Sequence, residues 1–258
     1  LRMWFLNRFE PDSAVNNIPL AIRLSGLLDR HALQVAVADV LARHESLRTV
    51  YPDADGVAYQ QVLPTSRVIP DLSPIPASEN ELIAEVLTMA SAGFDVSTQV
   101  PFRARLFEVS ATEHVLVLVV HHIAADGFSM GPLTRDVVVA YSARATGGEP
   151  EWEPLPVQYA DYALWQREIL GSEDDPDSVV ASQEAYWSGA LAGLPDQLDL
   201  PSDRPRPASA SNAGAVHEFS LGPELHAAIG RVARERNATP FMVVHAALSV
   251  LLARLSGT

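Results

Sequence analysis

The sequence predicts an α/β fold of the α+β layered kind, in which a mixed sheet is flanked by helices. Residues 115 to 120 form an unbroken apolar run that is mostly β-branched, as is typical of a central strand buried on both faces. Residues 32 to 47 carry leucine and valine at helical spacing, which predicts an amphipathic helix. At 258 residues the chain is long enough for one large domain or two small ones, with an ample core.

Proline and glycine bound the first elements. A helix ends before Pro11, because the residue preceding a proline is disfavoured in the helical conformation. A strand follows over residues 18–24, where apolar side chains recur with strand-like alternation. The turn Asp53–Gly56, in which glycine supplies a positive φ, joins residues 47–51 and 57–63 as a hairpin.

The middle of the chain predicts a second hairpin between two helices. Residues 79–92 have a helical pattern, and residues 102–109 and 114–120 form two strands around a short polar loop. Residues 131–144 place their apolar side chains on one helical face, and Gly147 ends that helix. The second strand of the hairpin is therefore the buried apolar run.

A stripe of aromatic residues marks the next helix, which is expected over residues 157–168. Tyr159, Tyr162 and Trp165 lie at positions i, i+3 and i+6 and share one helical face. We expect this stripe to pack in the core, as large aromatic side chains usually do. A further helix is expected over residues 182–191.

The segment 200–214 is rich in proline, serine and alanine, and it predicts an extended linker. It is the best candidate for a domain boundary. Beyond it the pattern predicts a strand over residues 215–221 and helices over residues 223–236 and 240–255. The last helix begins with Thr239 as its N-cap, followed by a proline at the first helical position.

The composition excludes several classes of function. The formal net charge of −14 argues against a general nucleic-acid surface or an anionic-membrane surface, because both need clustered positive charge. The chain has no cysteine, and all 18 basic residues are arginine, so thiolate zinc sites, cysteine nucleophiles and Schiff-base lysines are excluded. The apolar run 241–252 is too short to span a bilayer, and we expect a cytoplasmic protein.

The polar residues that could carry chemistry follow the buried strand directly. His121 and His122 stand at its end, and Asp126 and Gly127 come a few residues later. A metal site built from both histidines and Asp126 is disfavoured, because adjacent strand residues point to opposite faces. A serine hydrolase is also disfavoured: residues 127–131 read G-x-S-x-G, but they do not follow a strand directly, as a nucleophile elbow does.

The segment His121–Gly127 reads HHIAADG. It resembles the H-H-x-x-x-D-G active-site signature of the condensation domains of nonribosomal peptide synthetases, which epimerization domains share and which chloramphenicol-acetyltransferase-like acyltransferases carry as H-x-x-x-D-G. Further segments match the family in its order, reading WFLNRFEP, RHESLRT, YADYALWQ and LPSDRPRP. Within RHESLRT, we expect Arg43 and Arg48 to act mainly at a helix C-terminus, where positive charge is favourable.

The resemblance implies a chloramphenicol-acetyltransferase-like lobe, which is half of a V-shaped two-lobed domain with a tunnel between the lobes. Residues 1–199 would form the N-terminal lobe with the HHxxxDG motif, residues 200–214 the linker, and residues 215–258 the beginning of the C-terminal lobe. The remainder of the second lobe is not part of this sequence.

The resemblance also implies peptide-bond formation. The α-amine of a carrier-bound acceptor aminoacyl group would attack a carrier-bound donor thioester, joining an L-configured donor to an L-configured acceptor. His122 is the family's catalytic position, and it would accept a proton or a hydrogen bond from the amine. Gly127 would permit close backbone approach and place its N–H near the thioester oxygen.

Two other residues would support this site. His121 would hold the loop rather than react, and the carboxylate of Asp126 would pair with an arginine. Arg103 and Arg105, on the partner strand of the hairpin, are candidate partners for Asp126, and the absent lobe is the other possible source.

Substrates would arrive on phosphopantetheine arms, so the resemblance implies no tightly bound cofactor. The partners would be an upstream donor carrier protein, a downstream acceptor carrier protein and an adjacent adenylation domain in the same synthetase, serving secondary-metabolite or antibiotic biosynthesis. Nucleic acid and membrane are not expected partners. The alternatives are an epimerization domain or related H-x-x-x-D-G acyltransferase, and a non-catalytic carrier-binding fragment.

Overall fold

The computed structural model describes residues 2–205, 207–208, 215 and 217–257. It divides the chain into two compact units, with the boundary between Ser172 and Glu173. The first unit contains a sheet with its covering helices. The described part of the second unit contains the helices α6 (Val179–Ala190), α7 (Pro223–Glu235) and α8 (Pro240–Ser256).

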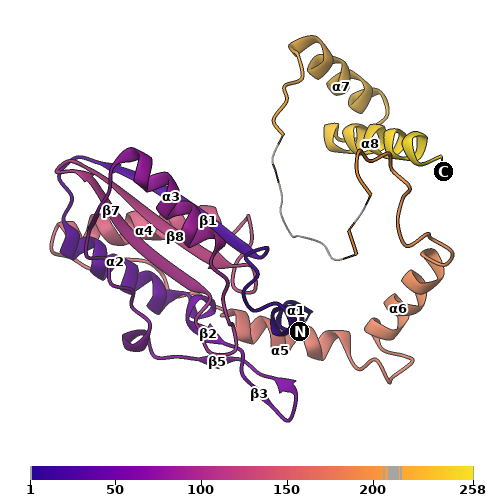
Figure 1. The fold of residues 1–258 in the computed structure, drawn as a ribbon. Coiled ribbons are helices and arrows are strands. Elements are labelled where there is room, and N and C mark those ends of the chain that lie inside the picture. Colours follow the sequence, from indigo (N-terminus) through magenta and orange to yellow (C-terminus); the bar gives the residue numbers. More distant parts are fainter. Residues whose placement is uncertain (1, 206, 209–214, 216, 258) are drawn as a thin grey trace. The chain divides into compact units, whose positions relative to one another are not determined.

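A four-stranded mixed sheet forms the centre of the first unit (Figure 1). Its strands lie in the order β1 (Asn17–Ser25), β8 (Glu113–His121), β7 (Phe102–Ser110) and β6 (Ile75–Pro76). Strand β8 is antiparallel to both β1 and β7, and β6 runs parallel to β7. The mixed sheet expected from the sequence is therefore confirmed.

Helices cover both faces of this sheet (Figure 1). Alternate residues of β8 pack against α2 (Arg30–Arg43) and α4 (Met130–Ala145) on one face. The intervening residues pack with α1 (Arg2–Phe9) and α3 (Glu79–Ser91) on the other face. Residues 115 to 120 are at most 4% exposed, which explains why the run has no polar interruption.

The remaining elements of the first unit follow the expected order. Their bounds are η1 (Glu45–Arg48), β2 (Thr49–Val50), β3 (Asp53–Ala54), β4 (Val57–Ala58), β5 (Gln61–Val62), η2 (Thr65–Arg67) and α5 (Tyr159–Leu170). Strand β2 pairs with β5, and β3 pairs with β4, so the first hairpin is confirmed. Its tip has Asp55 and Gly56 at positive φ, the conformation that such a turn requires.

Side chains of the RHESLRT segment act at the end of α2, as expected. Arg48 Nε donates to the carbonyl oxygen of Leu41 at 3.0 Å, and its Nη1 donates to the carbonyl of Leu63 at 2.8 Å. A guanidinium here satisfies a carbonyl of the last helical turn and complements the negative end of the helix dipole. Arg48 thereby also joins α2 to the hairpin.

Two expectations from the sequence are wrong. The described residues of 215–221 form no strand, because the described part of the chain offers them no partner strand for their backbone groups. The aromatic stripe on α5 is not core: Tyr159, Tyr162 and Trp165 are 54%, 40% and 54% exposed. Their rings pack on one another, because α5 has no apolar layer covering it within this unit.

The linker expected over residues 200–214 lies partly outside the described residues. Its described residues form neither helix nor strand. In the described residues, no single helix has the length and apolarity needed to cross a membrane. The bent pair of α7 and α8 meets those two criteria jointly, with an angle of 103° between the helices.

The glycine after α3 is required by close packing of two backbones. A Cβ at Gly93 would lie 2.6 Å from the Cα of Asp12 and would also clash with the carbonyl oxygen of Pro11. We expect Gly93→Ala to lower the free energy of unfolding by about 1–3 kcal/mol, as overpacking usually does. Urea unfolding measures this change. Gly131→Ala is the control, because nothing lies within 4 Å of its added Cβ and alanine favours the helix; equal losses in the two variants would contradict the packing explanation.

Candidate active site

His122 emerges at the end of the central strand. Strand β8 ends at His121, and the backbone N–H of His122 donates to the carbonyl of Asn16 at 2.7 Å. This bond extends the pairing with β1 by one residue and holds the backbone beneath the imidazole. The side chain of His122 is exposed, so it is accessible to a reactant.

His121 points the other way and is fully buried. Its Nδ1 accepts a hydrogen bond from the backbone N–H of Ile123 at 3.0 Å, and its ring meets Phe94 edge to face at 6.0 Å. Burial, together with the charge of neighbouring His122, lowers the pKa of His121 to about 4. The neutral imidazole thus holds the backbone of Ile123 at the start of the loop.

The low pKa of His121 predicts a pH-dependent stability. An unfolded histidine has a pKa near 6.5. Between pH 6.5 and pH 4 the folded state therefore binds fewer protons at this residue than the unfolded state does. Folding stability from this group is complete above pH 6.5, and we expect a loss of about 2–3 kcal/mol by pH 4.5. Urea unfolding at pH 7 and pH 4.5 measures it, with His121→Asn expected to flatten the dependence. His31→Asn, at an exposed position, is the control; equal flattening by both variants would contradict the assignment.

Asp126 and Ser129 close the loop after His122 and begin α4. The carboxylate Oδ1 of Asp126 accepts from the backbone N–H of Ser129 at 2.9 Å and from its hydroxyl at 2.7 Å. The Ser129 hydroxyl oxygen accepts in turn from the N–H of Asp126 at 3.0 Å. The bonds from Ser129 lower the pKa of Asp126, which is therefore a charged structural group at neutral pH.

Neither of the two candidate arginines on the hairpin, Arg103 and Arg105, pairs with Asp126 in this structure. Arg103 instead donates to the carbonyls of Ala92 and Gly93, and its guanidinium lies over the ring of Phe94. Arg105 forms no ion pair with Asp126 either. The neighbouring serine is closer in sequence and satisfies the carboxylate locally, without a long-range partner.

Gly127 has no conformational requirement for glycine in this structure. Its φ is not in the left-handed range, and a Cβ added there would meet no atom within 4 Å. The residue is exposed, so the space beside its backbone is open. The described residues therefore give no packing reason for glycine at this position.

The sequence did not reveal a buried charge cluster that forms between α4 and the end of α2. Asp136 on α4 is 5% exposed, and its Oδ2 lies 2.8 Å from Nε2 of His44 and 3.1 Å from Nε of Arg43. Burial raises the pKa of Asp136, but the bond to His44 and the charges of His44 and Arg43 outweigh it and lower the pKa. The signal in the sequence was an acidic residue on the apolar face of the helix, between Leu133 and Ala140.

The active-site loop is the segment of residues 122–129. A small cavity of about 220 Å³ lies beside it. His44, Ser46 and Leu47, from the end of α2 and from η1, line one wall. Ala124 and Ala125 of the loop form another wall, and the start of α4 completes the lining. The cavity thus joins two of the sequence motifs that sequence analysis treated separately.

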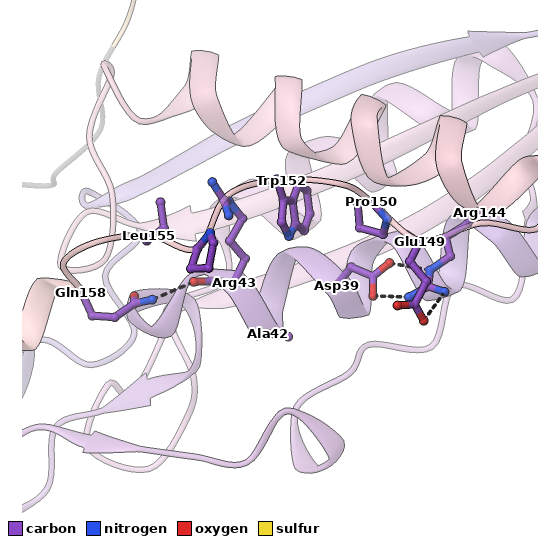
Figure 2. Close-up of a pocket in the computed structure, with 10 residues that line it drawn as sticks. Asp39, Ala42, Arg43, Arg144, Glu149, Pro150, Trp152, Leu155 and Gln158 are labelled. Carbon is purple, nitrogen blue, oxygen red and sulfur yellow. Dashed lines mark hydrogen bonds and ion pairs between the residues drawn. The ribbon is translucent and has the colours of Figure 1, made fainter.

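A larger cavity, of about 490 Å³, lies along α2 and α4 (Figure 2). Figure 2 shows Arg144 held between Asp39 and Glu149, with the bidentate pair to Asp39 at 2.7 and 2.9 Å. The guanidinium of Arg43 lies 4.7 Å from the ring centre of Trp152. Both cations already have partners, so they stabilise the helix pair.

In the described residues, no group of three or more His, Asp or Glu side chains is arranged to hold a metal ion.

Comparison with known proteins places this geometry in a family. A model described as "Condensation domain" matches residues 1–258. The probable non-canonical nonribosomal peptide synthetase CymA of Salinispora arenicola is 54% identical over 98% of the chain, and the dimodular nonribosomal peptide synthase of Bacillus subtilis is 47% identical over 98%. The chain spans only 3% and 11% of these two proteins.

Solved structures show the same fold. The X-domain from teicoplanin biosynthesis superposes with a TM-score of 0.90 and 38% identity, covering 98% of this chain and 55% of that one. The first condensation domain of the calcium-dependent antibiotic synthetase has a TM-score of 0.75 and 23% identity, covering 100% and 60%. Since the family model spans the whole sequence and the relatives are peptide synthetases, the chain belongs to the condensation-domain family of nonribosomal peptide synthetases.

Proposed function

We propose that this chain is the N-terminal part of a two-lobed domain that forms peptide bonds between carrier-bound aminoacyl groups. The observation that carries the proposal is the exposed imidazole of His122 at the end of a rigid, fully buried strand. Such a position gives a reactive group a defined location while leaving it open to a substrate. Joining an L-configured donor to an L-configured acceptor is the stereochemistry we assign.

In the proposed reaction, the acceptor amine attacks the carbonyl carbon of the donor thioester, and a C–N bond forms. The imidazole of His122 accepts the proton released by the amine as the tetrahedral intermediate forms. The C–S bond then breaks, and the proton passes to the departing phosphopantetheine sulfur. The substrate itself supplies the nucleophile, so the chain needs no serine or cysteine nucleophile.

The neighbouring residues have supporting roles in this proposal. The open backbone at Gly127 leaves room for the thioester, whose developing negative oxygen its N–H would stabilise. His121 and Asp126 hold the loop through their bonds to Ile123 and Ser129. None of these three residues is assigned a proton-transfer step.

We assign residues 1–199 to the N-terminal lobe, residues 200–214 to the linker and residues 215–258 to the start of the second lobe. The proposed partners are a donor carrier protein, an acceptor carrier protein and an adenylation domain of the same cytoplasmic synthetase. The relatives support this, because this chain covers only a small share of each synthetase. We assign the chain no resident cofactor.

The test uses the complete two-lobed domain that contains this chain, with donor and acceptor carriers loaded with aminoacyl-phosphopantetheine. Intact-protein mass spectrometry of the acceptor carrier should show the mass of a dipeptidyl group. Solvent deuterium entering the α-position of a carrier-bound aminoacyl group, without dipeptide formation, would instead establish an epimerization domain. If neither dipeptide nor deuterium exchange is detected with several aminoacyl pairs, catalysis is refuted.

A second candidate is a non-catalytic docking domain. It is favoured by the similarity to the teicoplanin X-domain, which has also been solved in a complex with OxyB at the same TM-score of 0.90. Carrier binding by calorimetry with no dipeptide and no deuterium exchange would support this candidate. Dipeptide formation by the wild type would exclude it.

A further inference from the structure

The small cavity beside the active-site loop lies close in the chain to His122. Ala124, in its wall, is two residues from His122, so the two Cα atoms are at most about 7 Å apart. The cavity therefore lies beside the segment of backbone that carries His122. Its volume of about 220 Å³ is below the range of about 300–1,000 Å³ typical of sites for whole small molecules.

The lining has the chemistry of a side-chain pocket. Leu47, Ala124, Ala125 and Leu133 give it apolar walls, and Ser46 contributes a hydroxyl. The described residues place no carboxylate or guanidinium in the lining. The one titratable lining group, His44, already has its Nε2 on Asp136. An aliphatic side chain would exchange water for apolar contact in this cavity.

One lining residue of this pocket, His44, is fixed by a hydrogen bond to a buried carboxylate. His44 lines the cavity, and its Nε2 lies 2.8 Å from the buried carboxylate of Asp136. Asp136 is also held by Arg43, so the imidazole is held in one orientation by groups outside the pocket. A wall positioned in this way can discriminate between side chains by shape, because it does not rearrange freely around a larger one.

We infer that this cavity is the specificity pocket for the side chain of a reacting aminoacyl group, and that it accepts small and branched aliphatic side chains. The inference rests on the proposed function, since it assumes that aminoacyl groups react beside His122. The donor and the acceptor aminoacyl groups share this chemistry, and the experiment separates them.

The first arm uses the complete two-lobed domain and offers it mixed alanyl- and leucyl-loaded carriers. In one set the donor varies against a glycyl acceptor, and in the other set the acceptor varies against a glycyl donor. Ala125→Leu and Ser46→Leu each add volume to the pocket, from two different segments of its lining. Ala42→Leu fills the larger cavity instead and is the matched control.

Both pocket variants should lower the ratio of leucyl to alanyl product at least about tenfold, because one methylene in an apolar pocket alters discrimination by about 10–200-fold. The set in which the ratio falls identifies the donor or the acceptor as the occupant. Ala42→Leu should leave both ratios unchanged. A uniform fall in turnover with unchanged ratios, or an equal shift in the control, would overturn the inference.

The second arm does not depend on catalysis. A carrier bearing a diazirine analogue of leucine, amide-linked to phosphopantetheine, is irradiated with the wild-type domain and the product is digested. Label on the peptides that contain residues 44–47 or 124–133 supports the pocket even if the wild type forms no dipeptide. Label confined to other peptides overturns the pocket, while dipeptide formation by the wild type independently keeps the proposed function.

Discussion

Replacing His122 with alanine is expected to lower the rate of dipeptide formation about 10²–10⁴-fold, the range typical for loss of a general base. The substitution removes the imidazole that accepts the amine proton and leaves the backbone bond to Asn16 in place. Because the side chain is exposed, the free energy of unfolding should change by no more than about 0.5 kcal/mol. Single-turnover mass spectrometry with loaded carriers measures the rate.

His31→Ala is the matched control for this prediction. It removes an exposed histidine from the same unit, at the start of α2 and away from the active-site loop. Its rate should equal that of the wild type. A His122→Ala variant that still condenses at the wild-type rate would remove His122 from the mechanism, and an equal loss in the control would show that the effect is not local.

Replacing Asp136 with alanine should lower the free energy of unfolding by about 3–5 kcal/mol, the cost of breaking a buried ion pair by removing one partner. The side chain is 7% exposed, and its loss leaves Arg43 and His44 partly buried without their shared carboxylate. Both groups lie at the end of α2, so the contact between α2 and α4 should weaken first. Urea unfolding gives the overall change, and hydrogen exchange of α2 and α4 peptides gives its location.

The same carboxylate should make stability depend on acidity. Its folded-state pKa lies below the usual value, so the unfolded chain binds the proton first as the pH falls. The stabilising contribution is complete above about pH 4 and is lost as the pH falls further through the folded pKa. The acid-induced loss that is attributable to this group should be missing from Asp136→Ala.

Asp39→Ala provides the comparison for Asp136→Ala. Asp39 pairs with Arg144 between the same two helices, but the side chains are 19% and 23% exposed, so water can replace part of the interaction. We expect a smaller loss of stability. A loss from Asp136→Ala of less than about 1 kcal/mol would show that burial of this cluster contributes little.

The sequence by itself determined the central strand, its two flanking helices and the position of His122. These features depend on local periodicity: residues 115 to 120 are apolar on both faces, and a residue directly after a buried strand must lie at the edge of the sheet. The opposite directions of His121 and His122 likewise follow from strand geometry. Local pattern was therefore sufficient wherever one element decided the outcome.

Only the tertiary structure decided which side chains meet. Asp136 meets His44 and Arg43 across 92 and 93 residues of chain, and no local periodicity specifies such a pairing. Arg103 does not pair with Asp126 for the complementary reason, since a serine three residues away binds the carboxylate at lower entropic cost.

The aromatic stripe on α5 makes the same point about burial. Its spacing correctly placed three rings on one helical face, but spacing does not determine what covers that face. Periodicity specifies the direction in which a side chain points within its own element. The arrangement of distant elements decides whether that direction leads to core, to solvent or to a cavity beside the reacting groups, because burial is a property of the packed chain.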